Sequence, residues 1–132
     1  MFTEVPCALH LDVRGRRFAL NGSIDLLVVS DDRVFIYDWK TDVTTKFSED
    51  YRIQLSVYYH CVLRQYPGRK VEAAIIWLSS ENPGVVKISP LPLEDISGLA
   101  QDSLRARGIR RLLCFVEIAR SETSCGDRPD RR

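Results

Sequence analysis

Residues 22–41 read GSIDLLVVSDDRVFIYDWKT, and this stretch decides the fold. Two runs of β-branched and aromatic residues, which favour strands, flank a short polar segment at 30–33. The first run continues a strand that begins at Arg17, with a bend or bulge expected at Gly22. The second run covers 34–39. Both alternating faces of this hairpin are largely apolar, so we expect it to lie at the centre of a sheet, covered on each side.

The rest of the chain supplies further strands and two helices around this hairpin. Upstream, residues 6–13 alternate in polarity as a half-buried strand does. Downstream we first expect a helix that is capped by Ser48 or Asp50 and ended by Pro67-Gly68. A buried strand over 71–78 and an edge strand over 85–88 follow. A second helix is expected from Leu93 into the 105–111 region, where Gly108 interrupts it. This element order predicts an α/β (α+β) domain with a central mixed β-sheet flanked by helices.

Length and composition restrict the class of protein. A chain of 132 residues with 45% hydrophobic and 28% charged residues suits one globular domain, here residues 1–119. Residues 120–132 have little to bury and are expected to form a disordered tail. The net charge of +1 gives no global evidence for nucleic acid. No run is long and apolar enough for a membrane span and no signal region is present, so we expect a cytoplasmic protein.

The four cysteines form no recognisable metal or disulfide pattern. They show no C-x-x-C pair and no cluster with His10 or His60 that would indicate zinc. We interpret them as reduced, mostly structural thiols. They are Cys7, Cys61, Cys114 and Cys125.

The polar segment fixes the pairing of the hairpin. With Asp31 and Asp32 as its two-residue loop, Asp25 on the first strand faces Asp38 on the second. Directly opposed residues share a face with β-carbons about 5 Å apart, so two carboxylates meet where water screens them poorly. Such a pair is stable when it shares a proton or when a divalent cation lies between the two groups.

Lys40 lies two residues beyond Asp38 and therefore on the same face of the strand. Together with Asp25, these residues bring two hard oxygen ligands and one ammonium group to one place. Carboxylates suit Mg²⁺ or Mn²⁺, and a cation there would polarise a phosphoryl oxygen while Lys40 orients the attacking water or stabilises developing charge. In the plainer interpretation, Asp38 and Lys40 form a surface ion pair and Asp25 is solvated at a strand end.

The first helix adds Gln54 and Tyr58, which are four residues apart and stack on one helix face. In an otherwise apolar helix this pair must find partners, and it could hydrogen-bond Lys40 or a phosphate. Taken alone, the pair favours the plainer interpretation, a helix face whose polar groups are satisfied for structural reasons.

Two further features carry weaker predictions. Four arginines near the second helix resemble a DNA-contacting patch, although a solvated helix face explains them as well. His10 lies on the polar face of its strand and is interpreted as a satisfied histidine rather than a ligand. The arginines are Arg105, Arg107, Arg110 and Arg111.

Three motifs in register resemble the RecB-type nuclease domain of the PD-(D/E)XK superfamily, in the version found at the C-terminal end of UvrD- and AddA-like helicases. The resemblance runs from about Glu4 to Leu91. The motifs are Gly-x-x-Asp at Gly22 and Asp25, Asp-x-Lys-Thr at Asp38, Lys40 and Thr41, and Gln-x-x-x-Tyr at Gln54 and Tyr58.

The resemblance implies a restriction-endonuclease-like core and an activity. Asp25 and Asp38, with the backbone carbonyl of Trp39, would bind Mg²⁺ or Mn²⁺, and Lys40 would position the attacking water. Gln54 and Tyr58 would support the site and the DNA backbone. The reaction implied is phosphodiester hydrolysis in DNA, as an exonuclease on single-stranded ends delivered by a DNA repair or recombination helicase.

Two departures from the family pattern qualify this interpretation. The family's N-terminal helix, which carries a further metal ligand, is missing from the sequence, and Glu4 is a candidate substitute. The iron–sulfur cluster of some relatives is not expected, because Cys114 and Cys125 lack its spacing. No ATP-binding loop is present, so any motor lies elsewhere. The alternative function is a catalytically impaired module that binds DNA or docks on a helicase; an unrelated α+β domain is a third interpretation.

Overall fold

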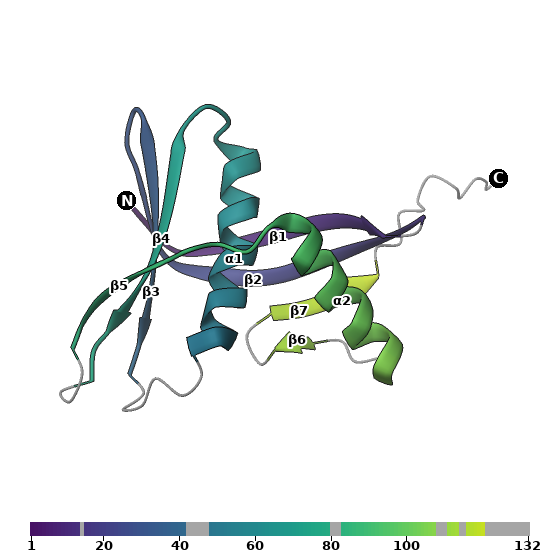
Figure 1. Cartoon of the computed structure of the whole chain (residues 1–132). Helices are drawn as coiled ribbons and strands as arrows, with labels where there is room; N and C mark the ends of the chain where they lie inside the picture. The colour runs from purple at the N-terminus through teal and green to yellow at the C-terminus, as the bar shows by residue number, and fades with distance from the viewer. Residues whose placement is uncertain (14, 42–47, 80–82, 108–110, 114–115, 121–132) are drawn as a thin grey trace.

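The computed structural model describes residues 1–13, 15–41, 48–79, 83–107, 111–113 and 116–120, and for residues 13, 16, 48 and 103 onward it describes the backbone only. These residues form one sheet and two helices (Figure 1). The elements are β1 (Phe2–Val13), β2 (Arg16–Val29), β3 (Arg33–Lys40), α1 (Ser48–Gln65), β4 (Lys70–Trp77), β5 (Gly84–Ile88), α2 (Leu93–Arg107), β6 (Arg111–Leu113) and β7 (Val116–Arg120).

The sheet is mixed, as predicted. The described strands lie in the order β5-β4-β3-β2-β7-β6, and β1 pairs with β2 beside this path. β3 and β4 are parallel, and the other pairs are antiparallel. Parallel neighbours need a crossover connection, and α1 provides it. β5 lies at one end of the order, so the predicted edge strand is confirmed.

The long β1–β2 hairpin joins the two halves of the sheet. In Figure 1 it extends from β3, past α1, to β7 and β6. β2 pairs with β3 through Leu26–Val29 and with β7 through Phe18–Asn21. Of the bend or bulge predicted at Gly22, the bulge is wrong, because Gly22 pairs with Cys7 in an unbroken register. β1 also begins earlier than the expected residue 6.

The helix α1 forms and ends where the sequence predicts. It begins at Ser48, with Glu49 and Asp50 in its first turn, where acidic groups interact favourably with the helix dipole. It ends before Pro67-Gly68, and Gly68 has a φ of 89°, a left-handed conformation that glycine adopts without a steric penalty. Its buried side packs against β1, β3 and β4.

Only one face of the central hairpin is fully buried. Leu27, Val34 and Ile36 belong to the core beneath α1. The opposite face, which includes Phe35 and Tyr37, is half-buried, so the prediction of full cover on both sides is wrong. Phe35 and Tyr37 stack on each other with their ring centroids 6.1 Å apart, which shields part of this apolar surface without a covering layer.

The C-terminal part differs from the prediction. α2 ends at Arg107, and Arg111, expected on the same helix, begins strand β6. Arg120, assigned to the tail, is the last residue of β7 and pairs with Phe18. Residues 121–132, the rest of the predicted tail, lie outside the described residues. Neither helix in the described ranges has the length and apolar character of a membrane span.

Candidate active site

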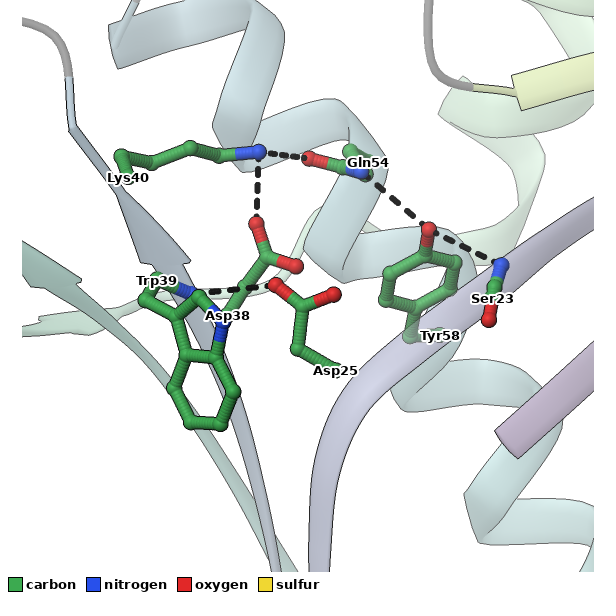
Figure 2. Close-up of polar contacts among 7 residues, drawn as sticks. All are labelled: Ser23, Asp25, Asp38, Trp39, Lys40, Gln54 and Tyr58. Atoms are coloured by element: carbon green, nitrogen blue, oxygen red, sulfur yellow. Dashed lines mark hydrogen bonds and ion pairs between the residues drawn. The ribbon is translucent and has the colours of Figure 1, made fainter. Parts of the chain in front are cut away.

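The two carboxylates meet as the hairpin register predicts. β2 and β3 pair Val29 with Val34 and Leu26 with Tyr37, and the next step of this register brings Asp25 to Asp38. Figure 2 shows the two carboxyl groups side by side. The regular ladder ends there, and Asp25 Oδ2 instead accepts a hydrogen bond of 3.2 Å from the backbone N–H of Trp39. That bond ties the end of β3 to β2 at the site.

Asp38 is an unusual carboxyl group because it is buried, with an exposed fraction of 2%. Burial raises its pKa from 3.8 to about 7, and a hydrogen bond with Asp25 contributes to the rise, while Lys40 opposes both effects. Near neutral pH, Asp38 is therefore partly protonated.

Lys40 places a cation beside this pair. Its Nζ lies 2.6 Å from Asp38 Oδ2 and donates a hydrogen bond of 3.1 Å to Gln54 Oε1. It also lies 4.3 Å from the centre of the Tyr51 ring, a cation–π contact. Strand alternation had predicted that Lys40 shares a face with Asp38, and the ion pair confirms it. The surface ion pair of the plainer interpretation is wrong, because both side chains are largely buried.

A chain of hydrogen bonds links Lys40 to strand β2 (Figure 2). Gln54 Nε2 donates to Tyr58 Oη over 3.1 Å, and the Ser23 backbone N–H donates to the same oxygen over 3.3 Å. Burial raises the pKa of Tyr58 to about 12, although the hydrogen bond from Gln54 opposes this, so Tyr58 stays neutral at pH 7. The predicted contact between Gln54 and Lys40 is confirmed. Lys40 is thus held from α1 as well as from β3.

Gly22 makes room for this chain. A Cβ atom built on Gly22 would lie 2.7 Å from Tyr58 Cε1 and 2.9 Å from Tyr58 Oη, both shorter than real contacts. The Tyr58 ring itself is 1% exposed, so it has no free space to move into. The Gly-x-x-Asp and Gln-x-x-x-Tyr motifs therefore meet in space: glycine on β2 admits the tyrosine of α1.

Sequence reasoning missed Tyr51 and the backbone of Ser23. The signal for Tyr51 was present, because Tyr51, Gln54 and Tyr58 follow the i, i+3, i+7 spacing of one helix face. No sequence signal marks the Ser23 N–H, since its role depends on where Tyr58 arrives.

Glu4, the candidate substitute ligand, lies opposite Asp25 between the paired residues Thr3–Leu26 and Val5–Ile24. It is exposed and has a φ of 50°, uncommon for a residue with a side chain. It does not complete a metal-binding cluster, because the described residues contain no group of three His, Cys, Asp or Glu placed to hold an ion. Its role as a ligand stays a prediction.

The remaining candidates lie apart from this cluster or outside the description. His10 is exposed and lines a groove with Arg17 and Arg64, and Thr41 is exposed after β3. The side chains of the predicted arginine patch lie outside the described residues. Cys7 and Cys61 are free thiols, as predicted, and the remaining cysteines lie outside the description.

The carboxylate pair suits a hard divalent cation. Within the described residues, Asp38 Oδ2 is buried with the Lys40 ammonium as its charged neighbour and no hydrogen-bond donor of good geometry. A second carboxylate lies beside it, and two oxygen donors of this kind match Mg²⁺ or Mn²⁺. Asp25 and Asp38 thus fit such an ion.

Comparison with known proteins agrees with this geometry. The fold is similar to that of the crystal structure of SSO0001, with a TM-score of 0.66 and 18% sequence identity over 80% of this chain and 50% of that one. The family model described as the PD-(D/E)XK nuclease superfamily matches residues 2–127. The chain therefore belongs to the PD-(D/E)XK nuclease superfamily, and the restriction-endonuclease-like fold expected from the motifs is confirmed.

Among curated proteins, the chain resembles the AddA-type component of the ATP-dependent helicase/nuclease in two streptococci. It is 34% identical to the Streptococcus sanguinis protein over 64% of this chain, and 31% identical to the Streptococcus mutans protein over 67%. The matches span 7% and 8% of those proteins, so the chain corresponds to a small region of each. The expected resemblance to the nuclease region of AddA-type proteins is confirmed.

Proposed function

We propose that this chain is a metal-dependent deoxyribonuclease domain that hydrolyses phosphodiester bonds at single-stranded DNA ends. The observation that carries the proposal is the buried Asp38 beside the half-buried Asp25, with Lys40 Nζ 2.6 Å from Asp38 Oδ2, in a chain of a nuclease superfamily. Two adjoining carboxylates are costly in a folded protein unless they serve to bind a cation or a proton.

Asp25, Asp38 and the backbone carbonyl of Trp39 would hold Mg²⁺ or Mn²⁺. When bound, the ion supplies Lewis acidity toward a phosphoryl oxygen and lowers the pKa of a bound water. Lys40 holds its ammonium beside Asp38, where it can orient the attacking water and stabilise negative charge on the phosphate. Gln54 and Tyr58 fix the Lys40 position through their hydrogen bonds.

The helicase context rests on the relatives. Both streptococcal proteins are named as parts of an ATP-dependent helicase/nuclease, and this chain matches only a small region of each. We propose that the domain works with a DNA repair or recombination helicase of the UvrD/AddA type, in the same polypeptide or as a partner. A motor that unwinds duplex DNA would deliver the unpaired ends that the nuclease cuts.

The test is cleavage of end-labelled single-stranded DNA with and without Mg²⁺ or Mn²⁺. We expect degradation that chelation stops, that Asp38→Asn abolishes and that Lys40→Met reduces at least about 100-fold. Asp31→Asn is the matched control, because Asp31 is an exposed carboxylate in the β2–β3 turn and lies outside the site. Equal cleavage by the wild type, Asp38→Asn and Lys40→Met would contradict the proposal.

One observation favours a second candidate function, a catalytically impaired module that binds DNA or docks on a helicase. In the described part of the chain, Asp25 and Asp38 are not joined by a third acidic, histidine or cysteine ligand. This candidate predicts that Mn²⁺ binds without any cleavage of DNA. The first candidate predicts binding and cleavage together.

A further inference from the structure

Exposed apolar side chains gather at the end of the sheet that carries the site. Trp39 is 41% exposed, Leu78 56% and Val85 63%. Trp39 lies next to the end of β3, Leu78 directly follows β4, and Val85 lies near the start of the antiparallel strand β5. These positions therefore meet at one end of three neighbouring strands. We refer to Trp39, Leu78 and Val85 as the apolar strip.

The strip lies on one face, opposite Asp38 and Lys40. Ile76 pairs with Trp39 on one side and with Val85 on the other, so these residues share a face. Leu78 follows Ile76 by two residues and continues the alternation, with its N–H donating to the Lys40 carbonyl over 2.8 Å. Figure 2 shows the Trp39 indole pointing away from Lys40 and Gln54.

The end of the same face that lies away from the site carries charged rather than apolar side chains. There Glu72 forms ion pairs with Arg33 at 2.9 Å and with Lys87 at 3.3 Å. Charged groups thus occupy the end of the face remote from the site, while the exposed apolar area is concentrated beside it. An exposed tryptophan with apolar neighbours is typical of a binding surface.

The position of Trp39 favours a nucleobase as the occupant. Trp39 lies between Asp38 and Lys40 in the chain, and its N–H donates to Asp25, so its backbone is part of the site. Because Asp38, Trp39 and Lys40 are the last residues of β3, a DNA strand whose phosphate lies at Asp38 and Lys40 can pass over the strand end to the indole. An unpaired base has an open aromatic face for stacking, whereas a base inside a duplex already stacks on its neighbours.

We propose that the Trp39 indole, flanked by Leu78 and Val85, is a stacking platform for an unpaired nucleobase next to the phosphate that is cut. This inference rests on the proposed nuclease function and names the residue that would select single strands over duplex. Stacking on an aromatic side chain contributes enough that its loss weakens binding about 5- to 150-fold.

The test compares the full chain's affinity for an oligothymidylate and for an abasic oligomer with the same number of phosphates, in EDTA so that nothing is cut. Binding is followed by tryptophan fluorescence, to which Trp39 contributes from the surface and Trp77 from the core. For the Trp39 variants, an end-labelled oligomer in a filter assay replaces fluorescence. Val86→Ala is the matched control, because Val86 is also an exposed apolar residue of β5 but alternates to the other face.

We expect the wild type to prefer the base-bearing oligomer by about 5- to 150-fold. Trp39→Ala removes this preference, Trp39→Phe keeps most of it and Val86→Ala leaves it intact. Equal binding of both oligomers by the wild type, or equal weakening of both by Trp39→Ala, would overturn the platform. The platform would also be overturned if the chain showed no base preference and instead self-associated in sedimentation in a Trp39-dependent way. That result would assign the apolar strip to a protein interface.

The same protein is assayed for Mg²⁺-dependent cleavage, which separates the two proposals. Cleavage by the wild type without base preference refutes the platform and leaves the nuclease function. Base preference that depends on Trp39, without cleavage, supports the platform and contradicts the nuclease function.

Discussion

Replacing Gly22 with alanine pushes a methyl group against the ring of Tyr58. The new Cβ would lie 2.7 Å from Cε1, 2.9 Å from Oη and 3.2 Å from Cζ of Tyr58, so the ring or strand β2 must move by several tenths of an ångström. Overpacking of this kind costs about 1–3 kcal/mol, and alanine recovers about 0.5–1 kcal/mol as the better strand residue. We therefore expect Gly22→Ala to lower the free energy of unfolding by about 1–2 kcal/mol.

A double-mutant cycle tests the cause of this loss. Tyr58→Leu removes the ring atoms that the new methyl group meets, so Gly22→Ala should be neutral or slightly stabilising in that background. The resulting coupling energy is about 1–3 kcal/mol, measured from urea unfolding of the two single variants and the double variant.

Gly98→Ala is the matched control for the glycine substitution. Gly98 lies in α2, and a Cβ built there meets nothing within 4 Å, so alanine should stabilise the protein by about 0.5–1 kcal/mol. If Gly22→Ala stabilises as Gly98→Ala does, or costs the same with Tyr58 and with Leu at position 58, the close contact does not govern this part of the site.

Three further substitutions test the electrostatics of the site. Folding raises the pKa of Asp38 from 3.8 to about 7, so this group stabilises the metal-free protein most below about pH 4. The free energy of unfolding then falls by roughly 4 kcal/mol as the pH rises from 4 through 7. Asp38→Asn should remove that fall in thermal unfolding between pH 4 and 8, and an unchanged pH profile would refute the raised pKa. Lys40→Met removes the cation 2.6 Å from Asp38, so cleavage should fall at least about 100-fold and the affinity for Mn²⁺ should change far less; full retention of activity would contradict its role. Gln54→Leu leaves Lys40 and Tyr58 without the amide that joins them, which should cost about 1–3 kcal/mol in urea unfolding, whereas a loss below about 0.5 kcal/mol would show that the linkage does not stabilise the fold.

The local features of the site could be predicted from the sequence. The turn at Asp31 and Asp32 fixes the strand register, and counting outward from it correctly brings Asp25 to Asp38. Strand alternation then places Lys40, and helical spacing stacks Gln54 on Tyr58. Each step depends on residues close in the chain, for which periodicity is a reliable guide.

The role of Gly22 could not be read in this way. A glycine within a strand indicates a bulge or a close approach of another group, and the sequence alone does not say which. The structure shows the close approach, which is made by Tyr58 on helix α1, 36 positions further along the chain. Motif residues that meet only in the folded state therefore had to be linked by resemblance rather than by spacing.

The C-terminal strands and the open sheet face were missed for a related reason. Leu113 and Val116 belong to short strands whose stability depends on pairing with each other and with β2, a non-local effect that outweighs local propensity. Likewise, apolar residues such as Phe35 and Tyr37 suggest burial, but only the assembled fold shows which face α1 covers. The hydrophobic pattern of a segment predicts a strand, but it does not predict which elements pair with that strand or cover its faces.

The most direct test of the account is calorimetric titration of Mn²⁺ into the wild type and Asp38→Asn. We expect one ion per chain for the wild type, no binding to Asp38→Asn, and displacement of the proton that Asp38 holds with a pKa of about 7. Buffers of different ionisation enthalpy should report release of about 0.5 proton per ion at pH 7 and about 0.1 at pH 8. Absence of binding to the wild type, or equal binding to both proteins, would contradict a cation site between Asp25 and Asp38.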